Sequence, residues 1–570
     1  MKSVRTIRRR DCEPGSDWPD SVPPLLRRIY AARGAYGLHL ARPRLADLLP
    51  PDALGGLGTA TGLLIDAIAN DRHIVIVGDF DCDGATACAV GVRGLRMLGA
   101  RHVSYAVPNR MVHGYGLSVA LVDELAALSP DLLVTVDHGI ACHTGIAAAK
   151  ARGWRVLVTD HHLPGERLPP ADAIVNPNLP GDAFPSKMLA GVGVMFYVLL
   201  AVRRALREAD RLPSEPDLAA LLDLVAVGTV ADLVPLDANN RALVSAGLRR
   251  LRAGQGCAGL NALIEVAGRE ASRLTASDIG FALAPRINAA GRLEHMALGI
   301  ECLLSDDPRQ ARELAEILHG INAERQGLQQ NMVDDAEALL QRAGIAHGNM
   351  PAGLCLYDGE WHPGVVGLVA SKLKERTHRP TIAFAPSEPG SGSLRGSARS
   401  IPGFHIRDAL AAVDAAHPGL IERFGGHAMA AGLSLQAASL DAFRAAFAAA
   451  AERLLLPEML MDEVLSDGEL DGTEFTRENA VALRDGGPWG QGYQEPVFDG
   501  EFDVLAWRVV GEKHLKVELG RGALRLNGIH FGGWDGAEPA ARLRIAYRLE
   551  PDDYRGGQAI QLVIVHAEPA

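Results

Sequence analysis

The chain has 570 residues, of which 48% are apolar and 22% charged, and its formal net charge is −12. This composition is typical of a globular protein with several domains, and it excludes a disordered chain or one coated in basic surface. Any contact with nucleic acid must therefore come from local positive patches. The seven cysteines are scattered without a C-x-x-C pair, which favours reduced thiols in the cytoplasm over disulfides or a structural zinc site.

Residues 1–70 predict a helical preface, with helices expected at 24–33 and 59–70. The Arg-rich start has no apolar core behind it, so it does not resemble a signal peptide. The longest uncharged apolar run, 188–202, has 15 residues. A membrane span needs about 20, so we expect a buried helix there and no membrane association.

Strand and helix patterns alternate from residue 73 onward. Apolar runs at 74–77, 103–107, 132–136 and 156–159 are separated by helical patterns at 85–98, 118–127 and 144–152. This alternation predicts an α/β domain whose parallel sheet is covered by helices on both faces.

Acidic and imidazole side chains follow the ends of three predicted strands. These are Asp79, Asp81 and Asp83, then Asp137, then Asp160, His161 and His162; a fourth segment, 221–230, leads to Asp232. Because parallel strands bring their carboxyl ends to one edge of a sheet, we expect these groups to converge. The first three acids would point to one side if the chain stayed extended until Gly84 turns it into the helix.

Converging carboxylates require cations, since each close pair repels by roughly 4 kcal/mol at an effective dielectric near 20. Oxygen-rich ligation with one or two imidazoles and no thiolate suits Mn²⁺ or Mg²⁺. Two ions that share a carboxylate would hold the attacking and leaving oxygens of a phosphoryl group. The pattern thus predicts hydrolysis of a phosphoester with two metal ions.

Other interpretations of the acidic residues are open. Asp79, Asp81, Asp83 and Gly84 match the first six positions of a calcium EF-hand loop, but the twelfth position is Val90 instead of Glu and the loop follows a strand. An acidic surface turn would also fit this stretch alone. Taken singly, Asp137 could be a helix N-cap and His161 a core histidine.

These motifs resemble the DHH phosphoesterase superfamily, in Gly-Asp-Phe-Asp-Cys-Asp-Gly at 78–84, Val-Asp-His-Gly at 136–139 and Asp-His-His at 160–162. Further motifs are similar to the RecJ family of single-strand-specific exonucleases, nearly from end to end. They are Val-Pro-Asn-Arg at 107–110 with Gly-Tyr-Gly at 114–116, Leu-Ala-Gly-Val-Gly at 189–193, Gly-Thr-Val-Ala-Asp at 228–232 with Asn-Asn-Arg at 239–241, and Ala-Pro-Arg-Ile-Asn-Ala-Ala-Gly-Arg at 284–292.

The resemblance implies roles for individual residues of this sequence. Asp81 and Asp137 would hold one ion, and Asp83, Asp137, His161 and Asp232 the other, with Asp137 as the bridge. Asp79 or water would complete the first site, because Val77 stands where some relatives have a histidine. His162 would face the scissile phosphate, and His138 could add a titrating group nearby. The motifs also imply substrate contacts from Arg110, Tyr115, Arg286, Asn288 and Arg292.

A second domain is expected after helices at 311–318 and 325–340. Its Gly-Gly-His-Ala-Met-Ala-Ala-Gly at 425–432 resembles the signature of the DHHA1 domain. Between residues 361 and 408, seven Lys or Arg stand against three Asp or Glu, a local charge of +4. Glycines let backbone N–H groups approach phosphates, and Arg and Ser side chains bind them. The predicted substrate residues here are Arg395, Ser397, Arg399, Ser400, Gly426 and His427.

The C-terminal region has five short alternating runs with Gly-rich turns, which predict a small β-barrel, and the resemblance implies an OB-fold. Stacking and positive charge for a single strand could come from Trp489, Tyr493, Trp507, Lys513, His514 and Lys516. Aromatic residues in a small barrel are more often part of its core.

The predicted architecture is α/β: a parallel-sheet DHH domain, a long helical connector, an α/β DHHA1 domain and a small C-terminal β-barrel. The expected boundaries are 1–70, 71–292, 293–345, 346–456 and 457–570, the last beginning with an acidic linker.

The leading hypothesis is a Mn²⁺- or Mg²⁺-dependent exonuclease of single-stranded DNA. The family implies 5′ to 3′ polarity, a role in recombination and repair, and partners such as a single-stranded-DNA-binding protein and a RecQ-type helicase. The alternatives are a DHH phosphodiesterase of oligoribonucleotides or cyclic dinucleotides, and a non-catalytic RecJ-like scaffold.

Overall fold

The computed structural model describes residues 5–570 except 13–14, 16–17, 110–111, 213, 343–349 and 389. The chain forms two compact units, which we call the large unit (10–322 and 467–570) and the small unit (1–9 and 323–466). Among the described residues, no helix is both long and apolar enough to cross a membrane.

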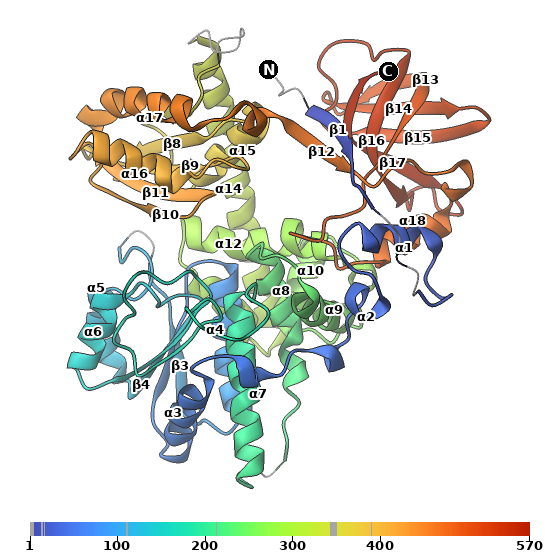
Figure 1. The fold of residues 1–570 in the computed structure, drawn as a ribbon. Helices are drawn as coiled ribbons and strands as arrows, with labels where there is room; N and C mark the ends of the chain where they lie inside the picture. The colour runs from blue at the N-terminus through green and yellow to red at the C-terminus, as the bar shows by residue number, and fades with distance from the viewer. Residues whose placement is uncertain are drawn as a thin grey trace. The chain divides into compact units, whose positions relative to one another are not determined.

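A five-stranded parallel sheet organises the large unit, in the order β3-β2-β4-β5-β6. Its strands β3 and β4 are labelled in Figure 1. Its strands are β2 (Ile74–Val77), β3 (Val103–Ala106), β4 (Leu132–Val136), β5 (Arg155–Thr159) and β6 (Ala173–Val175). The four predicted strands are confirmed, and β6 is an addition that the sequence pattern did not reveal.

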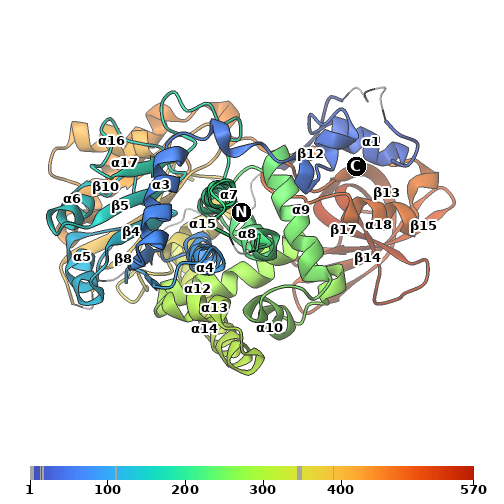
Figure 2. The same cartoon turned by 90° about the horizontal axis from the view of Figure 1, so that it is seen from below.

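Helices cover both faces of this sheet, as the unbroken apolar strands require. Ile74 and Ile76 belong to the main core with α4 and α7, whereas Val75 and Val77 pack in a second cluster with α5 and α6. In Figure 2, α5 and α6 lie on one side of β4 and β5, and α3, α4 and α7 lie on the other. These helices are α3 (Leu57–Ala69), α4 (Cys82–Met97), α5 (Val119–Leu125), α6 (His143–Ala151) and α7 (Gly191–Glu208). The predicted buried helix is α7, which begins three residues later than the apolar run and continues beyond it.

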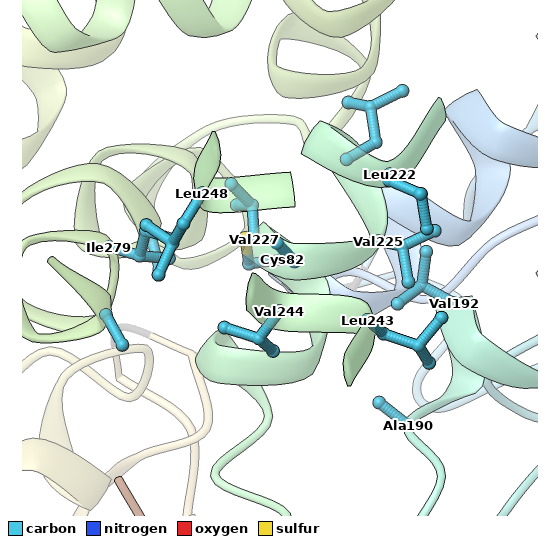
Figure 3. Packing of buried hydrophobic residues seen from close by; sticks show 14 of the residues in the cluster. Cys82, Ala190, Val192, Leu222, Val225, Val227, Leu243, Val244, Leu248 and Ile279 are labelled. Atoms are coloured by element: carbon cyan, nitrogen blue, oxygen red, sulfur yellow. The ribbon is translucent and has the colours of Figure 1, made fainter. Parts of the chain in front are cut away.

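A helical layer packs beside α4 and α7. In Figure 3, Val192 of α7, Val225 of α8 and Leu243 of α9 belong to one apolar cluster. The close approach of α8 to α9 depends on Gly247, where a Cβ would lie 2.1 Å from the Leu222 carbonyl oxygen. The helices of this layer are α8 (Leu222–Ala231), α9 (Ala238–Arg252), α10 (Ala258–Val266), α11 (Ala276–Asp278), the π-helix η6 (Ile279–Leu283), α12 (Ala284–Leu293) and α13 (Ala297–Leu304).

A single helix, α14 (Pro308–Arg342), replaces the two helices that the sequence predicts at 311–318 and 325–340. Its residues up to 322 belong to the large unit and the rest to the small unit. Gly320 lies in the gap between the predicted helices but has no packing partner within 4 Å of its Cβ position. An isolated helical glycine costs only about 1 kcal/mol, so the helix continues through it.

The small unit contains a mixed sheet in the order β10-β11-β9-β8-β7. The core beneath it includes Phe384, Phe443 and Phe447. The strands are β7 (Leu354–Tyr357), β8 (Thr381–Pro386), β9 (Ser393–Arg399), β10 (Arg423–Gly426) and β11 (Ala430–Gln436), and the helices are α15 (Val366–Thr377), α16 (Ile406–Ala416) and α17 (Leu440–Leu454). The N-terminal strand β1 (Arg5–Arg9) joins this unit by pairing in parallel with β12 (Asp462–Ser466), a long-range pairing that the sequence did not predict.

The C-terminal region forms the predicted closed barrel, in the order β13-β14-β15-β17-β16. Its strands are β13 (Phe498–Val510), β14 (His514–Arg521), β15 (Leu524–His530), β16 (Arg542–Pro551) and β17 (Ile560–Pro569). The helix α18 (Arg477–Asp485) precedes it, and the N-terminal helices are α1 (Pro24–Ala31) and α2 (Leu38–Ala41).

Candidate active site and metal centre

The acidic loop after β2 turns into a helix earlier than the sequence suggests. Helix α4 begins at Cys82 instead of residue 85, and Asp81 is its N-cap, accepting a 3.0 Å hydrogen bond from the Gly84 N–H. Asp83 therefore lies in the first helical turn. The prediction that the three acids point to one side of an extended chain is wrong, because this turn sends Asp83 to a different partner from Asp79 and Asp81.

That partner is the N-terminus of α7. The two oxygens of the buried Asp83 accept hydrogen bonds from the backbone of Gly191 (2.6 Å) and Val192 (2.9 Å). A Cβ on Gly191 would lie 2.5 Å from the Cβ of Asp137, and one on Gly228 would lie 2.9 Å from an oxygen of Asp83. Only glycine leaves room here, so the motif glycines let α7 and α8 approach the acids.

Asp137 is the centre of the cluster. It directly follows β4, is 1% exposed and has a φ of 65°, a strained conformation for a residue with a side chain. His161 Nε2 lies 3.0 Å from its Oδ1 and 3.6 Å from an oxygen of Asp232, the C-cap residue of α8. Oδ1 of Asp137 is buried and accepts no hydrogen bond from the described residues, as expected of an atom reserved for a cation.

Burial and mutual repulsion raise the pKa of three of these acids. The pKa of Asp83 rises to about 7, through burial and the nearby charge of Asp81. Burial and the neighbouring carboxylates also raise the pKa of Asp137 and of Asp232 well above the ordinary value. Such acids release their protons fully only when positive charge is added, which is what a metal ion provides.

The ligand atoms fall into overlapping sets whose members all lie within 4.8 Å of one another. One set is Asp79, Asp81 and Asp137; another is Asp83, His161 and Asp232; the third is Asp137, His161 and His162. Carboxylate oxygens with one or two imidazoles are the donors that Mn²⁺ and Mg²⁺ accept. The residues present thus fit two neighbouring divalent ions.

The sequence patterns placed Asp160 among the converging groups but assigned it no role. Its Oδ1 accepts hydrogen bonds from the backbone of His161 (2.7 Å) and His162 (3.0 Å) and from the His162 ring (2.8 Å), and its Oδ2 accepts one from Ile140. These bonds occupy both oxygens, so Asp160 orients the histidines. Its position as the first residue of the Asp-His-His motif was the available signal.

His138 does not add a titrating group to the site, contrary to the expectation from sequence. It is fully buried, and its Nε2 lies 3.0 Å from the Val77 carbonyl oxygen. Burial lowers its pKa to about 4, so the ring is neutral at physiological pH and joins β4 to β2.

Three family models match this chain, and they cover its successive regions. The DHH family N-terminal domain matches residues 73–229, the DHHA1 domain 351–453 and the RecJ OB domain 466–566. The single-stranded-DNA-specific exonuclease RecJ of Dickeya dadantii is 51% identical over 100% of both chains. The chain belongs to the RecJ family.

Solved RecJ structures agree with this assignment. RecJ from Thermus thermophilus in complex with Mn²⁺ superposes with a TM-score of 0.80 at 33% identity, over 96% of this chain and 76% of that one. Its complex with Mg²⁺ gives a TM-score of 0.75 at 31% identity, over 96% and 75%. Membership over the full length favours the exonuclease hypothesis over the small-substrate and scaffold alternatives.

The predicted substrate residues of the large unit differ in what they contact. The rings of Tyr115 and His162 lie 6.3 Å apart, which puts Tyr115 beside the metal centre. Asn288 instead accepts a 2.8 Å hydrogen bond from the Cys82 N–H, so it supports the acidic loop. Arg286 donates to His319 (3.2 Å) and to the Ala282 carbonyl. Arg292 is half-buried in the last turn of α12, and Arg110 lies outside the described residues.

Strand β9 of the DHHA1 domain carries three predicted substrate residues on one face. Arg395, Ser397 and Arg399 alternate with the buried Leu394, Gly396 and Ala398. Arg399 donates a 3.0 Å hydrogen bond to the Ser397 hydroxyl.

The other DHHA1 residues occupy the neighbouring turns. His427 is exposed in the turn between β10 and β11, and Gly426 has a φ of 143° with no room for a Cβ beside Ala430. Ser400 is buried, and its hydroxyl donates a 2.6 Å hydrogen bond to the Phe404 carbonyl. This bond favours a structural role for Ser400 over contact with substrate.

On the barrel, Trp507 is 37% exposed and its ring stacks on Trp534 with centroids 5.5 Å apart. Trp534 was not predicted from the sequence, because no motif marks its loop. Lys516 is on β14, opposite Arg508 of β13, and Lys513 is in the turn that joins the two strands. Trp507 is thus outside the barrel core. Trp489 and Tyr493 are buried, so the prediction that they stack on bases is wrong.

Proposed function

We propose that this chain is an exonuclease that hydrolyses single-stranded DNA from the 5′ end, releases mononucleotides and acts in recombination and repair. The observation that carries this proposal is the convergence of five carboxylates and two imidazoles at one edge of the parallel sheet, in a chain that belongs to the RecJ family over its full length. Its cofactor is Mn²⁺ or Mg²⁺, the ions named for the solved RecJ complexes.

We assign the two ions to the two carboxylate sets. Asp79, Asp81 and Asp137 would hold one, and Asp83, Asp137, His161 and Asp232 the other. When bound, the ions would supply positive charge for the attacking and leaving oxygens of the phosphodiester. Asp137 is our choice for the shared ligand, because its Oδ1 lies 3.0 Å from His161 Nε2. The residue also groups both with Asp79 and Asp81 and with His161 and His162.

His162 would act on the scissile phosphate as a cation. Burial alone would lower its pKa, but the hydrogen bond and charge of Asp160 raise it to about 9. The ring therefore carries a proton on each nitrogen at neutral pH. With Nδ1–H donated to Asp160, the Nε2–H is the group that would donate to a phosphate oxygen.

Other parts of the chain would bind the strand away from the chemistry. We propose that residues 71–292 carry catalysis and that 346–456 bind phosphates through Arg395, Ser397 and Arg399. The barrel within 457–570 would stack bases on Trp507. The preface (1–70) and connector (293–345) would support these parts. We place the enzyme in the cytoplasm, with a single-stranded-DNA-binding protein and a RecQ-type helicase as partners.

The test is digestion of an oligonucleotide labelled at either end in separate reactions, with Mn²⁺, Mg²⁺ or EDTA, beside a matching duplex and a dinucleotide. We expect metal-dependent release of mononucleotides from the 5′ end of the single strand alone. Asp83→Ala or His161→Ala should abolish cleavage and leave single-strand binding largely intact.

Three outcomes would contradict the proposal. Cleavage of the dinucleotide alone would indicate a small-substrate phosphodiesterase, and binding without cleavage would indicate a scaffold. Retained turnover in both variants would refute the assigned metal ligands.

A further inference from the structure

Two large apolar side chains are exposed beside the elements that build the metal centre. Leu233 is 69% exposed and Phe281 is 82% exposed. They are the exposed large apolar residues among the described residues between 190 and 310. Single exposed apolar residues are common on protein surfaces, so only the position of these two relative to the metal centre can indicate a role.

The backbone holds Leu233 in its exposed position. It directly follows Asp232 and has a φ of 61°, a conformation that is unfavourable for a residue with a branched side chain. The following segment is fixed by a 2.7 Å hydrogen bond from the Leu236 N–H to the Gln491 carbonyl. Such strain persists where the surrounding structure maintains it, and it occurs most often at functional sites.

Phe281 is presented by the π-helix η6. Ile279, Ala282 and Leu283 of the same turn are buried, so the turn is anchored while the Phe281 ring faces solvent. Gly280 packs against α8, since a Cβ there would lie 3.6 Å from Val230, two residues before Asp232. Single π-helical turns are rare and are frequent at functional sites.

The helix that follows η6 supports the acidic loop. Asn288 of α12 binds the Cys82 N–H, and Gly291 lies so close that a Cβ would be 1.9 Å from the Phe80 carbonyl oxygen. Phe281 is therefore on a continuous helical segment that contacts the acidic loop at one end and α8 at the other. Seven residues of helix place it about 10 Å along the axis from Asn288.

We propose that Phe281 stacks on an unpaired base of the substrate strand close to the metal centre, with Leu233 as a second apolar contact for the strand. This inference rests on the proposed function. The bases of a single strand expose their faces, and stacking on an aromatic side chain is worth about 1–3 kcal/mol per base. In a duplex those faces are covered by neighbouring pairs, so the contact also favours single strands.

The test compares Phe281→Ala, Phe281→Trp and the unaltered chain in binding a fluorescent single strand by anisotropy, in EDTA so that no cleavage occurs. We expect Phe281→Ala to raise the Kd about tenfold, Phe281→Trp to restore it, and the salt dependence to stay unchanged because no phosphate contact is lost. Tyr36→Ala, another exposed aromatic residue of the large unit, is the matched control and should bind normally.

A set of oligonucleotides, each with one abasic position, makes the test specific. In the unaltered chain one position should weaken binding, and in Phe281→Ala that position should have no further effect. The melting temperature of Phe281→Ala should be unchanged, because the ring is exposed. An unchanged Kd, or an abasic profile identical to that of the unaltered chain, would overturn the inference. Metal-dependent cleavage, lost in Asp83→Ala, tests the proposed function separately.

Discussion

Asp160, which is buried, and His162, which is half-buried, form an ion pair in which each partner shifts the pKa of the other. Burial would raise the pKa of Asp160, but the hydrogen bonds and charge of His162 lower it to about 2, while Asp160 raises that of His162 to about 9. The stability from Asp160 is present above its ordinary pKa near 4 and is lost as the pH falls toward 2. The stability from His162 is full below about pH 6.5 and is lost as the pH rises through 9. Both groups are therefore charged at neutral pH.

Asp160→Asn should remove the charge that keeps His162 protonated. We expect the alkaline limb of the pH–rate profile to move from near pH 9 to below pH 7, with a loss of about 10²-fold in cleavage rate at neutral pH, the low end of the range for general acid catalysis. Single-turnover cleavage across pH measures both effects.

Asp172→Asn is the matched control for this change. Asp172 is also ion-paired, with Lys150 at 2.5 Å, but it is outside the metal centre. The pH–rate profile of Asp172→Asn should have the same alkaline limb as that of the unaltered chain. An unshifted limb in Asp160→Asn would contradict the proposal that a protonated His162 acts on the scissile phosphate.

At the scale of elements, strand β9 presents one polar face because side chains alternate along a strand. Arg395, Ser397 and Arg399 share this face, and α15 approaches it so closely that a Cβ on Gly367 would lie 2.8 Å from the Arg399 guanidinium. The strand thus carries two arginines and a hydroxyl at about 7 Å spacing from one same-face residue to the next. That spacing suits contacts to successive phosphates.

Arg399→Ala should weaken binding of a single strand and lower the slope of log K against log salt by about 0.7, the value for one phosphate contact. Anisotropy titrations at several salt concentrations measure the slope. Arg453→Ala removes an exposed arginine at the end of α17 and should change the slope less. Equal slopes in Arg399→Ala and the unaltered chain would show that Arg399 does not contact a phosphate of the strand.

For the whole molecule, the metal centre concentrates negative charge in a chain whose net charge is already −12. Asp83, Asp137 and Asp232 have raised pKa values, with that of Asp83 at about 7. A carboxyl group whose pKa is raised by folding stabilises the fold at low pH, and that contribution is lost as the pH rises from about 4 through the folded value. The metal-free protein therefore becomes less stable as these acids ionise.

Metal removal should expose this effect. In EDTA we expect the melting temperature to fall between pH 6 and pH 8, and added Mn²⁺ to raise it more at pH 8 than at pH 6, because metal binds the ionised acids. Differential scanning calorimetry measures these shifts. Asp83→Asn should reduce the pH dependence of the melting temperature in EDTA. Equal stabilisation by Mn²⁺ at pH 6 and pH 8 would contradict the proposal that the buried acids ionise in this range.

The amino-acid sequence alone determined the parallel sheet, the closed barrel and the identity of the acids at the sheet edge. Each of these depends on a local pattern: β-branched runs such as 74–77, short alternating strands, and carboxylates placed directly after a strand. Parallel strands end at a common edge, so convergence of Asp79, Asp137 and His161 followed from order along the chain.

Only the tertiary structure decided how these groups divide and what surrounds them. Asp83 separates from Asp81 because α4 begins early and the N-terminus of α7, more than 100 residues later, binds its carboxylate. Asp160 becomes a partner of His162, the buried His138 contacts the Val77 carbonyl, and Phe281 remains exposed on η6. Each outcome depends on contacts between distant segments. These contacts decide which side chains are buried, and burial in turn shifts their pKa values. Local sequence patterns predict which runs are buried but do not specify these contacts between distant segments.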